Sequence, residues 1–453
     1  MRRYSIIIYI FIMTLSVISP LRAQEVFSLK EAVGTALREN PEIRAFTWHL
    51  EGVRQDEEIT KAMRLPRLSL EHSISKTDNP TYAFMGKLNQ ERFSQSDFAI
   101  NSLNNPSPVG DFQTEFRFEM PLISPRLTAG IKLSKGMTER ENHLFQEKRE
   151  ETALRVLKTY LSVRTARAYR EAALKGLQDA EEHRRLAELL YRNGLGLYSD
   201  LLRAEVFLKK AQTELEKAEA GLDIARSALG LLMGRTEPVE IDGKLPDFPV
   251  NDLDYFINSA MNKDEIRYMK ASLKNAERNL SLQKSLLLPE VGIGGSYQIN
   301  DHRSPIRAEG SSYMAGVFLR WSLFDPTIQP KIKKAEAGLM ETREGLSGLK
   351  KAVIFRVKKA YRRVEEKRKN LERAEASVRE AEEALKLVRT RYKNSLSPIV
   401  DLLDTETLLQ KARAERIEAE NDLLLSIGEL YYQSGILVDY ILNDNKDKKE
   451  VIK

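Results

Sequence analysis

The sequence predicts a mostly helical protein with a smaller share of β-strand, built from two tandem repeats. Three observations support this prediction. Two segments about two hundred positions apart align with each other, long stretches hold almost only helix-forming residues, and four short stretches alternate apolar with polar residues. Each repeat is therefore expected to hold a helix, two strands and a long antiparallel helical hairpin.

The repeat is clearest at two turns, residues 191–203 and 392–404, which superimpose at a shift of 201 positions. The match continues forward to the pair Gly234 and Gly435. Near the start of each repeat the shift is 223 positions instead. The first repeat therefore carries about 22 extra residues, which lie within 76–111 and read as a surface loop.

Each repeat opens with a helix, over 28–61 in the first and over 252–285 in the second. Ser28 followed three positions later by Glu31 is the capping-box pattern of a helix start. The dipeptide Asn40-Pro41 predicts a break or kink near the middle of the first helix, because proline has no N–H to donate.

Four strands of roughly ten residues are predicted where the helical period gives way to strict alternation. They lie near 68–75, 112–120, 291–300 and 313–322. Their length, aromatic residues and polar second face fit outer-membrane strands, with a half-buried sheet as the alternative. Four strands cannot close a barrel and an open edge is costly in lipid, so three copies would share 12 strands.

Helix formers dominate residues 126–190 and 331–391, apart from scattered glycines. Some 60 residues of helix extend roughly 90 Å. The turn at 193–199 reverses the chain, and residues 200–232 return as the second helix of a hairpin. Leucine seams and many alanines allow close packing, so these hairpins are expected to lie side by side in a wall or tube.

The predicted organisation has five parts: a secretory signal peptide at 1–23, a first repeat at 24–237, a linker at 238–251, a second repeat at 252–440 and a polar tail at 441–453. The signal peptide is indicated by arginines at positions 2 and 3, an apolar run and a small residue, Ala23. That run is shorter than the ~20 residues that a spanning helix needs.

The amino-acid composition excludes several classes of partner and membrane anchor. Charged residues make up 30% of the chain, with a net charge of +6 and interspersed signs, which indicates solvated helix faces and no nucleic-acid partner. The chain has no cysteine, which excludes disulfides and a lipid carried on an N-terminal cysteine. No later stretch is apolar enough for a transmembrane helix, so any membrane entry is expected through strands.

No catalytic, cofactor or metal site is predicted. The five histidines, at 49, 72, 143, 183 and 302, show no ligand spacing, and His183 is expected on the surface. The glycines at 292–295 lie inside a predicted strand without the helix that a phosphate-binding loop requires. No nucleophile has a partnered base, so the sequence predicts a protein that is not an enzyme.

The order of helix, strand, strand and hairpin, present twice behind a signal peptide, resembles the TolC-like outer-membrane efflux proteins. The two turns, 193–202 and 395–404, carry this resemblance, which covers nearly all of the mature chain. It implies a homotrimer whose 12-stranded barrel in outer-membrane lipid continues into a periplasmic α-helical tunnel. It further implies a passive exit duct for an inner-membrane pump acting through a periplasmic adaptor, in tripartite efflux or type I secretion.

The resemblance also implies that the hairpin tips contact the adaptor. Gly194, Leu195 and Gly196 occupy that position in the first repeat, and Ser395 and Leu396 occupy it in the second. The second turn has serine where the first has glycine, which makes the first tip the stronger candidate.

Asp401 and Asp404 fall where some members of that family carry acidic residues around the tunnel constriction. Carboxylates three positions apart share one helix face, so three chains would form a ring of six that attracts cations. Asp200 and Arg203 are their counterparts in the first repeat, and Arg203 is expected to neutralise part of the ring by pairing with the acids of the second. The alternative role for Asp200 and Asp401 is to complement a helix dipole.

A periplasmic coiled-coil adaptor or scaffold that enters no membrane is the competing prediction. Long hairpins fit both functions. An adaptor is expected to have one hairpin flanked by compact β domains, whereas this chain has duplicated pairs of amphipathic strands. The strands therefore favour the channel.

Overall fold

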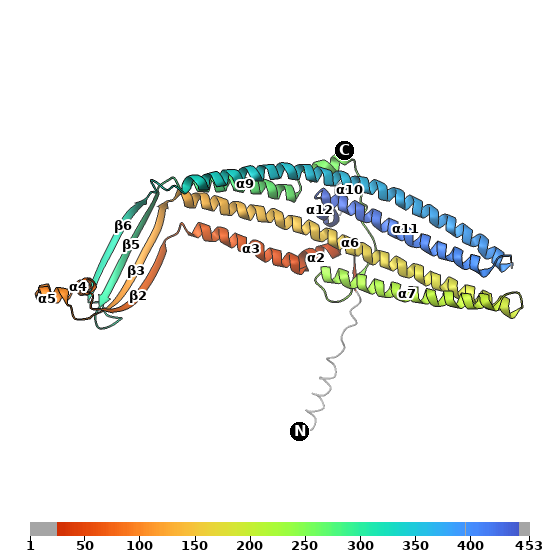
Figure 1. Cartoon of the computed structure of the whole chain (residues 1–453), viewed down its shortest axis with the longest axis horizontal. Coiled ribbons are helices and arrows are strands. Elements are labelled where there is room, and N and C mark those ends of the chain that lie inside the picture. The colour runs from red at the N-terminus through yellow and green to blue at the C-terminus, as the bar shows by residue number, and fades with distance from the viewer. Residues whose placement is uncertain (1–24, 395, 444–453) are drawn as a thin grey trace, which may run out of the picture. The chain divides into compact units, whose positions relative to one another are not determined.

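The computed structural model describes residues 25–394 and 396–443 (Figure 1). The predicted signal peptide, Ser395 and most of the predicted polar tail lie outside these ranges. Within them, no helix is both long and apolar enough to cross a membrane.

The elements follow the predicted order, and the mostly helical class with strands is confirmed. The first half contains β1 (Val26–Phe27), α2 (Leu29–Glu39), α3 (Pro41–Ala62), β2 (Arg67–Thr77), α4 (Pro80–Asn89), η1 (Gln95–Phe98), α5 (Ile100–Asn104), β3 (Val109–Ile123), α6 (Pro125–Arg192) and α7 (Tyr198–Leu232). The second half contains β4 (Glu240–Ile241), α8 (Leu253–Ala260), α9 (Asp264–Ser285), β5 (Glu290–Asp301), β6 (Gly310–Arg320), α10 (Ile328–Lys393), α11 (Ile399–Gln433) and α12 (Leu437–Leu442).

The first predicted helix is divided into α2 and α3 at the predicted break. The capping box is present, because Ser28 Oγ accepts from the Glu31 N–H at 3.3 Å and the Glu31 carboxylate accepts from the Ser28 N–H at 2.9 Å. Asn40 Oδ1 accepts from the Glu42 N–H at 2.8 Å and so caps α3. Pro41 takes the first helical position, where a missing N–H is tolerated.

Two long hairpins, α6 with α7 and α10 with α11, form the predicted antiparallel pairs (Figure 1). Helix α6 has 68 residues, or roughly 100 Å at 1.5 Å per residue. The second hairpin packs on the first through α11. Arg164 of α6 donates to Glu420 at 2.6 Å, and the Tyr169 hydroxyl donates to Glu418 at 2.9 Å.

The four long strands form one antiparallel sheet in the order β2, β3, β5, β6, with β2 and β6 at its edges. One row across the sheet joins Leu70 to Phe116, Phe116 to Tyr297, and Tyr297 to Tyr313. These four side chains are 44% to 82% exposed in the single chain. The sheet therefore presents an apolar face that the chain itself does not cover.

The inserted segment within 76–111 is predicted as a surface loop, and the structure adds that it contains three short helices, α4, η1 and α5. Asn79 caps α4, since its Oδ1 accepts from the Thr81 N–H at 3.1 Å and Pro80 takes the first helical position. Phe93 packs edge to face on Phe84 and Phe98, with ring centroids 4.7 and 5.1 Å away. This aromatic cluster gives the segment a small core.

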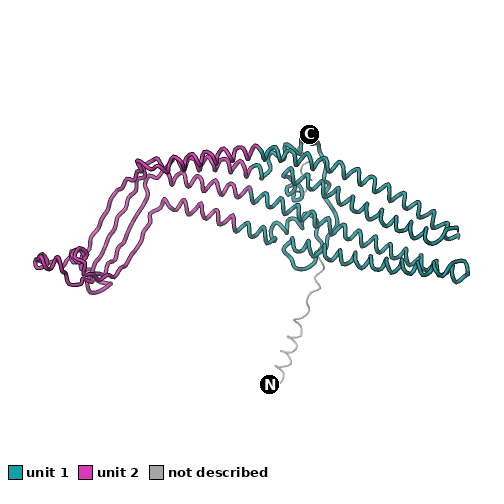
Figure 2. The backbone as a smooth tube through the Cα atoms, viewed as in Figure 1, with its two compact units in different colours: residues 1–48, 144–266, 348–453 teal, residues 49–143, 267–347 magenta. Residues whose placement is uncertain are grey.

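Contacts divide the chain into two compact units, each made of segments from both repeats (Figure 2). Of the described residues, the first unit holds 25–48, 144–266, 348–394 and 396–443, and the second holds 49–143 and 267–347. The core of the first unit surrounds Tyr160, Phe256 and Tyr431, all 2% exposed or less. Units are defined by contact and repeats by sequence, so the repeat boundaries stay a prediction.

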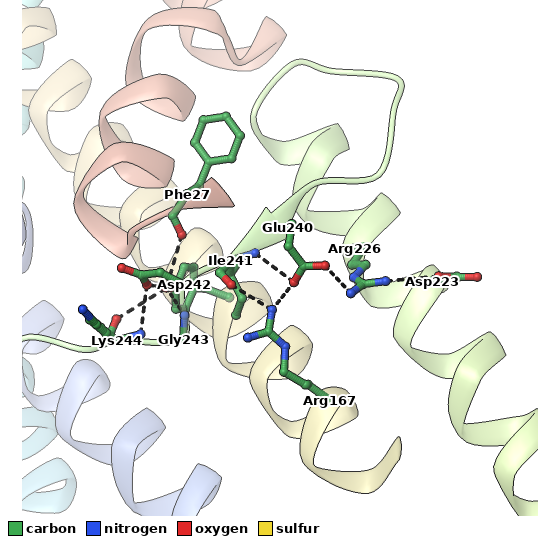
Figure 3. A network of polar contacts seen from close by, with 10 residues as sticks. Phe27, Arg167, Asp223, Arg226, Glu240, Ile241, Asp242, Gly243 and Lys244 are labelled. Atoms are coloured by element: carbon green, nitrogen blue, oxygen red, sulfur yellow. Dashed lines mark hydrogen bonds and ion pairs between the residues drawn. The ribbon is translucent and has the colours of Figure 1, made fainter. Parts of the chain in front are cut away.

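A polar network fixes the predicted linker to the first hairpin (Figure 3). Glu240 of β4 accepts from the guanidinium of Arg167 on α6 and forms an ion pair with Arg226 on α7. Asp242 accepts from the Tyr160 hydroxyl at 2.7 Å, and burial together with this carboxylate raises the pKa of Tyr160. The linker is thereby held in place where β4 pairs in parallel with β1.

Candidate functional site at the hairpin tips

The tip of the first hairpin is a tight turn between α6 and α7. The Gly194 N–H donates to the Tyr191 carbonyl at 3.0 Å, and the Leu195 N–H donates to the Leu190 carbonyl at 2.9 Å. This pair of bonds is the Schellman motif that ends a helix, and it places one residue in the left-handed region. Gly194 has that conformation, with φ +71°. Glycine adopts it without strain, so the turn itself explains why this residue is glycine.

The second tip repeats part of this geometry. The Leu396 N–H donates to the Arg391 carbonyl at 2.9 Å, and these two residues are the counterparts of Leu195 and Leu190. Ser395, also predicted to contact the adaptor, lies outside the described residues. Helix α11 begins directly after Pro398.

Both tips expose large apolar side chains. Gly194 is exposed and Gly196 is half-buried. The apolar side chains that are 55% to 75% exposed here are Leu195, Leu197, Tyr198 and Leu396. Apolar groups gathered at the end of a highly charged hairpin are typical of a surface that contacts another protein.

The four predicted gate residues lie in the first two turns of the return helices. Asp200 and Asp401 occupy the first turns of α7 and α11, where a carboxylate complements the helix dipole. Asp401, Asp404 and Arg203 are exposed. Within the described part of the single chain, no ion pair joins Arg203 to either acid of α11, so their pairing stays a prediction for an assembly.

Asp200 lies close to the second hairpin. Tyr392 of α10 is 4% exposed and belongs to a cluster, called here the tip cluster, that joins all four hairpin helices: Ala187, Ala204, Tyr392, Ile399 and Leu402. Burial, and then the negative charge of Asp200, raise the pKa of Tyr392 to about 12. The tip cluster therefore ties the first tip to the second within one chain.

A buried pair near the tips was not predicted. His183 of α6 and Glu406 of α11 are each 1% exposed, with Nε2 and Oε2 3.4 Å apart. The expectation of a surface position for His183 is wrong, because α11 covers it. Burial, and then the charge of Glu406, raise the pKa of the half-buried Asp179 one turn away. In the sequence, only the match of Glu406 to Glu205 between the two repeats marked this position.

Solved structures with a similar fold include outer-membrane proteins. The structure aligns with VceC from Vibrio cholerae at TM-score 0.71 and 15% identity, over 90% of this chain and 96% of that one. It aligns with the open state of MtrE from Neisseria gonorrhoeae at TM-score 0.71 and 18% identity, over 90% and 88%. At these identities the likeness shows the fold.

Sequence comparison adds two matches. The profile of the outer membrane efflux protein family matches residues 32–235 and 258–435. The outer membrane protein TolC of Vibrio cholerae is 26% identical over 181 residues, which are 38% of this chain and 40% of that relative. The alignment with this relative thus spans less than half of its length, whereas the family profile spans most of the chain.

Proposed function

The chain belongs to the outer membrane efflux protein family, and we propose that it is the exit duct of a tripartite efflux pump or a type I secretion system. Membership places the chain in the outer membrane. The proposed role is passive conduction without catalysis: an inner-membrane pump drives the substrate, and a periplasmic adaptor links the pump to the tips. The observation that carries this proposal is the joining of an exposed apolar sheet to two long hairpins in one chain.

Three copies are proposed to share one 12-stranded barrel. A single chain leaves β2 and β6 as sheet edges, and unpaired backbone groups at an edge are costly in hydrocarbon. Pairing β6 of one copy with β2 of the next removes every edge, and cyclic symmetry makes all such contacts equivalent. The apolar row that includes Phe116 and Tyr297 would then face lipid.

The hairpins give independent support for several copies. In α11, Leu402 and Glu406 are buried against the first hairpin. On α7, by contrast, Leu202 and Val206 are 44% and 69% exposed, and Leu387 of α10 is 59% exposed. Apolar side chains in these positions are suited to contact between α7 of one copy and α10 of the next, closing six hairpins into a periplasmic tunnel.

The tips are proposed to serve two purposes. Leu195 and Leu396, with the neighbouring glycines and Ser395, would contact the adaptor. Asp401 and Asp404 would ring the tunnel constriction, with Asp200 and Arg203 beside them. The exposure of both acids of α11 supports this role, because unpaired carboxylates around a narrow opening attract cations.

Conductance of the purified channel in planar bilayers tests the gate. Replacing both Asp401 and Asp404 by alanine is expected to raise single-channel conductance and reduce cation selectivity. Glu415→Ala is the matched control, since Glu415 is an exposed acid further along α11. Unchanged conductance and selectivity in the double variant would remove the gate role, whereas absence of any channel would contradict the duct itself.

The competing proposal, a periplasmic scaffold, would leave the apolar row of the sheet in water. Membrane fractionation separates the two functions. Recovery in the outer-membrane fraction is expected for the duct, and recovery only in the soluble periplasm would favour the scaffold.

A further inference from the structure

The turn between β5 and β6 brings together three side chains of metal-binding type. Asp301, His302 and Glu309 each offer one ligand atom, and these atoms all lie within 4.8 Å of one another. We propose that this turn binds a zinc ion through these three residues. The proposal concerns the second compact unit and does not depend on the proposed duct.

The backbone holds the three residues in place. The Glu309 N–H donates to the Asn300 carbonyl at 3.0 Å and closes the turn. Asp301 is the last residue of β5, and its Oδ1 accepts from the N–H groups of Arg303 and Ser304 at 2.6 and 2.8 Å. The carboxylate is therefore oriented before an ion arrives, which favours binding.

The other carboxylate oxygen of Asp301 has no hydrogen-bond partner among the described residues. Asp301 is 1% exposed, and this oxygen, Oδ2, is buried. Buried polar atoms are rarely left unpaired in native structures. A cation beside the turn would satisfy this oxygen.

The inserted segment is bonded to the residue that precedes Asp301. Gln90, directly after α4, donates to the Gly110 carbonyl and to Asp111, both at 2.8 Å, and Asp111 accepts from Asn300 at 2.8 Å. These bonds hold the end of α4 beside the start of the turn.

The histidine has a proton that the ion would displace. Arg303 Nε donates to His302 Nε2 at 2.7 Å, so Nδ1 carries the ring proton and donates it to Glu309. On binding, zinc takes the place between Nδ1 and Glu309, the ring proton moves to Nε2, and the bond from Arg303 is released. The ring stays neutral and no proton is lost from it.

The types of ligand atom indicate which metal the turn binds. One imidazole nitrogen and two carboxylates suit a tetrahedral zinc site with a fourth position for water. Calcium and magnesium prefer oxygen ligands alone. Glu309 is exposed, which leaves a path for the ion.

Calorimetric titration of the full chain tests the site. The detergent-purified protein, stripped with EDTA, is titrated with zinc chloride, and one zinc per chain is expected. His302→Ala and Glu309→Gln are each expected to weaken binding at least about tenfold, since even outer-shell partners contribute that much. Arg303→Ala is expected not to weaken it, because the bond that zinc must break is absent.

His72→Ala is the matched control, because His72 lies in the same unit and contacts Thr114 of β3 instead. This control is expected to bind zinc as the unaltered protein does. If His302→Ala alters the circular dichroism spectrum, the zinc affinity of Glu309→Gln alone tests the site, because Glu309 is exposed. Absence of saturable zinc binding, equal affinity in the site variants and the control, or calcium binding as tight as zinc would overturn the proposal.

Discussion

The return helices of the two hairpins, α7 and α11, have the same length and the same place in the repeat but different surroundings. Both contain 35 residues. Helix α11 buries eleven of them and α7 buries four, because α11 is covered by the first hairpin as well as by α10. The repeat therefore determines the secondary structure of both helices, and the neighbouring helix determines how much of each is buried.

Equivalent tyrosines at the two tips show the same difference. Tyr392 is 4% exposed inside the tip cluster, whereas Tyr191 is 43% exposed and lies against Tyr198 with ring centroids 5.4 Å apart. The described residues leave one face of α7 uncovered. A second copy of the chain would give α7 the kind of neighbour that α11 already has.

The largest effect is expected from a leucine of the tip cluster. Leu402→Ala truncates a side chain that is 0% exposed. This leaves a cavity between the two hairpins. The free energy of unfolding should fall by about 2–5 kcal/mol, measured by urea denaturation followed by circular dichroism. Leu408→Ala on the same helix is the control, since Leu408 is 62% exposed. Equal losses in both variants would contradict the assigned packing of α11.

A pH-dependent effect is expected at Glu150 of α6. Glu150 is 8% exposed and accepts from the Val438 N–H at 3.3 Å. Burial raises its pKa to about 7 from 4.5. A carboxyl whose pKa is raised in the folded state does not lower the free energy of unfolding below pH 4.5. It lowers this free energy increasingly from pH 4.5 to 7, and by a constant amount above pH 7.

Glu150→Gln should therefore stabilise the protein by up to about 3 kcal/mol at pH 8 and leave stability unchanged at pH 4. Urea denaturation at the two pH values measures this. The repeat-equivalent control is Lys351→Gln on α10, because Lys351 is exposed. A gain of the same size at both pH values would show that it does not come from ionisation of Glu150.

A smaller difference is expected between the equivalent glutamates. Glu406→Ala leaves the buried His183 without its partner and should lower the free energy of unfolding by about 1–3 kcal/mol. Glu205→Ala should change it by less than about 1 kcal/mol, because the contact of Glu205 with Arg184 spans 3.9 Å and both side chains are over 40% exposed. Equal effects of the two substitutions would contradict the difference in burial between α11 and α7.

Local chemistry explains which parts of the fold were predictable. The capping box at Ser28 and Glu31, the break at Asn40-Pro41 and the alternating strands depend on residues near one another in sequence. The repeat then placed both hairpins. The order of the four strands in the sheet, and the exposed row that includes Tyr313, required the structure.

The missed features depend on contacts between distant segments. His183 is buried because α11 returns across α6, and nothing beside it in the sequence signals that. Asp301, His302 and Glu309 meet because the loop between β5 and β6 folds back on itself, whereas their spacing matches no ligand pattern. The helices of the inserted segment are stabilised by Phe84, Phe93 and Phe98, whose contacts form only after the segment folds back.

The mass of the detergent-extracted protein, measured by light scattering with bound detergent subtracted, tests the central claim most directly. The shared barrel predicts three copies of a chain of at most 51.8 kDa, because four strands per chain must reach 12 to leave no edge. Val206→Asp, which places a charge on the uncovered face of α7, should weaken that assembly. A stable single chain in detergent would contradict the shared barrel and the tunnel built on it.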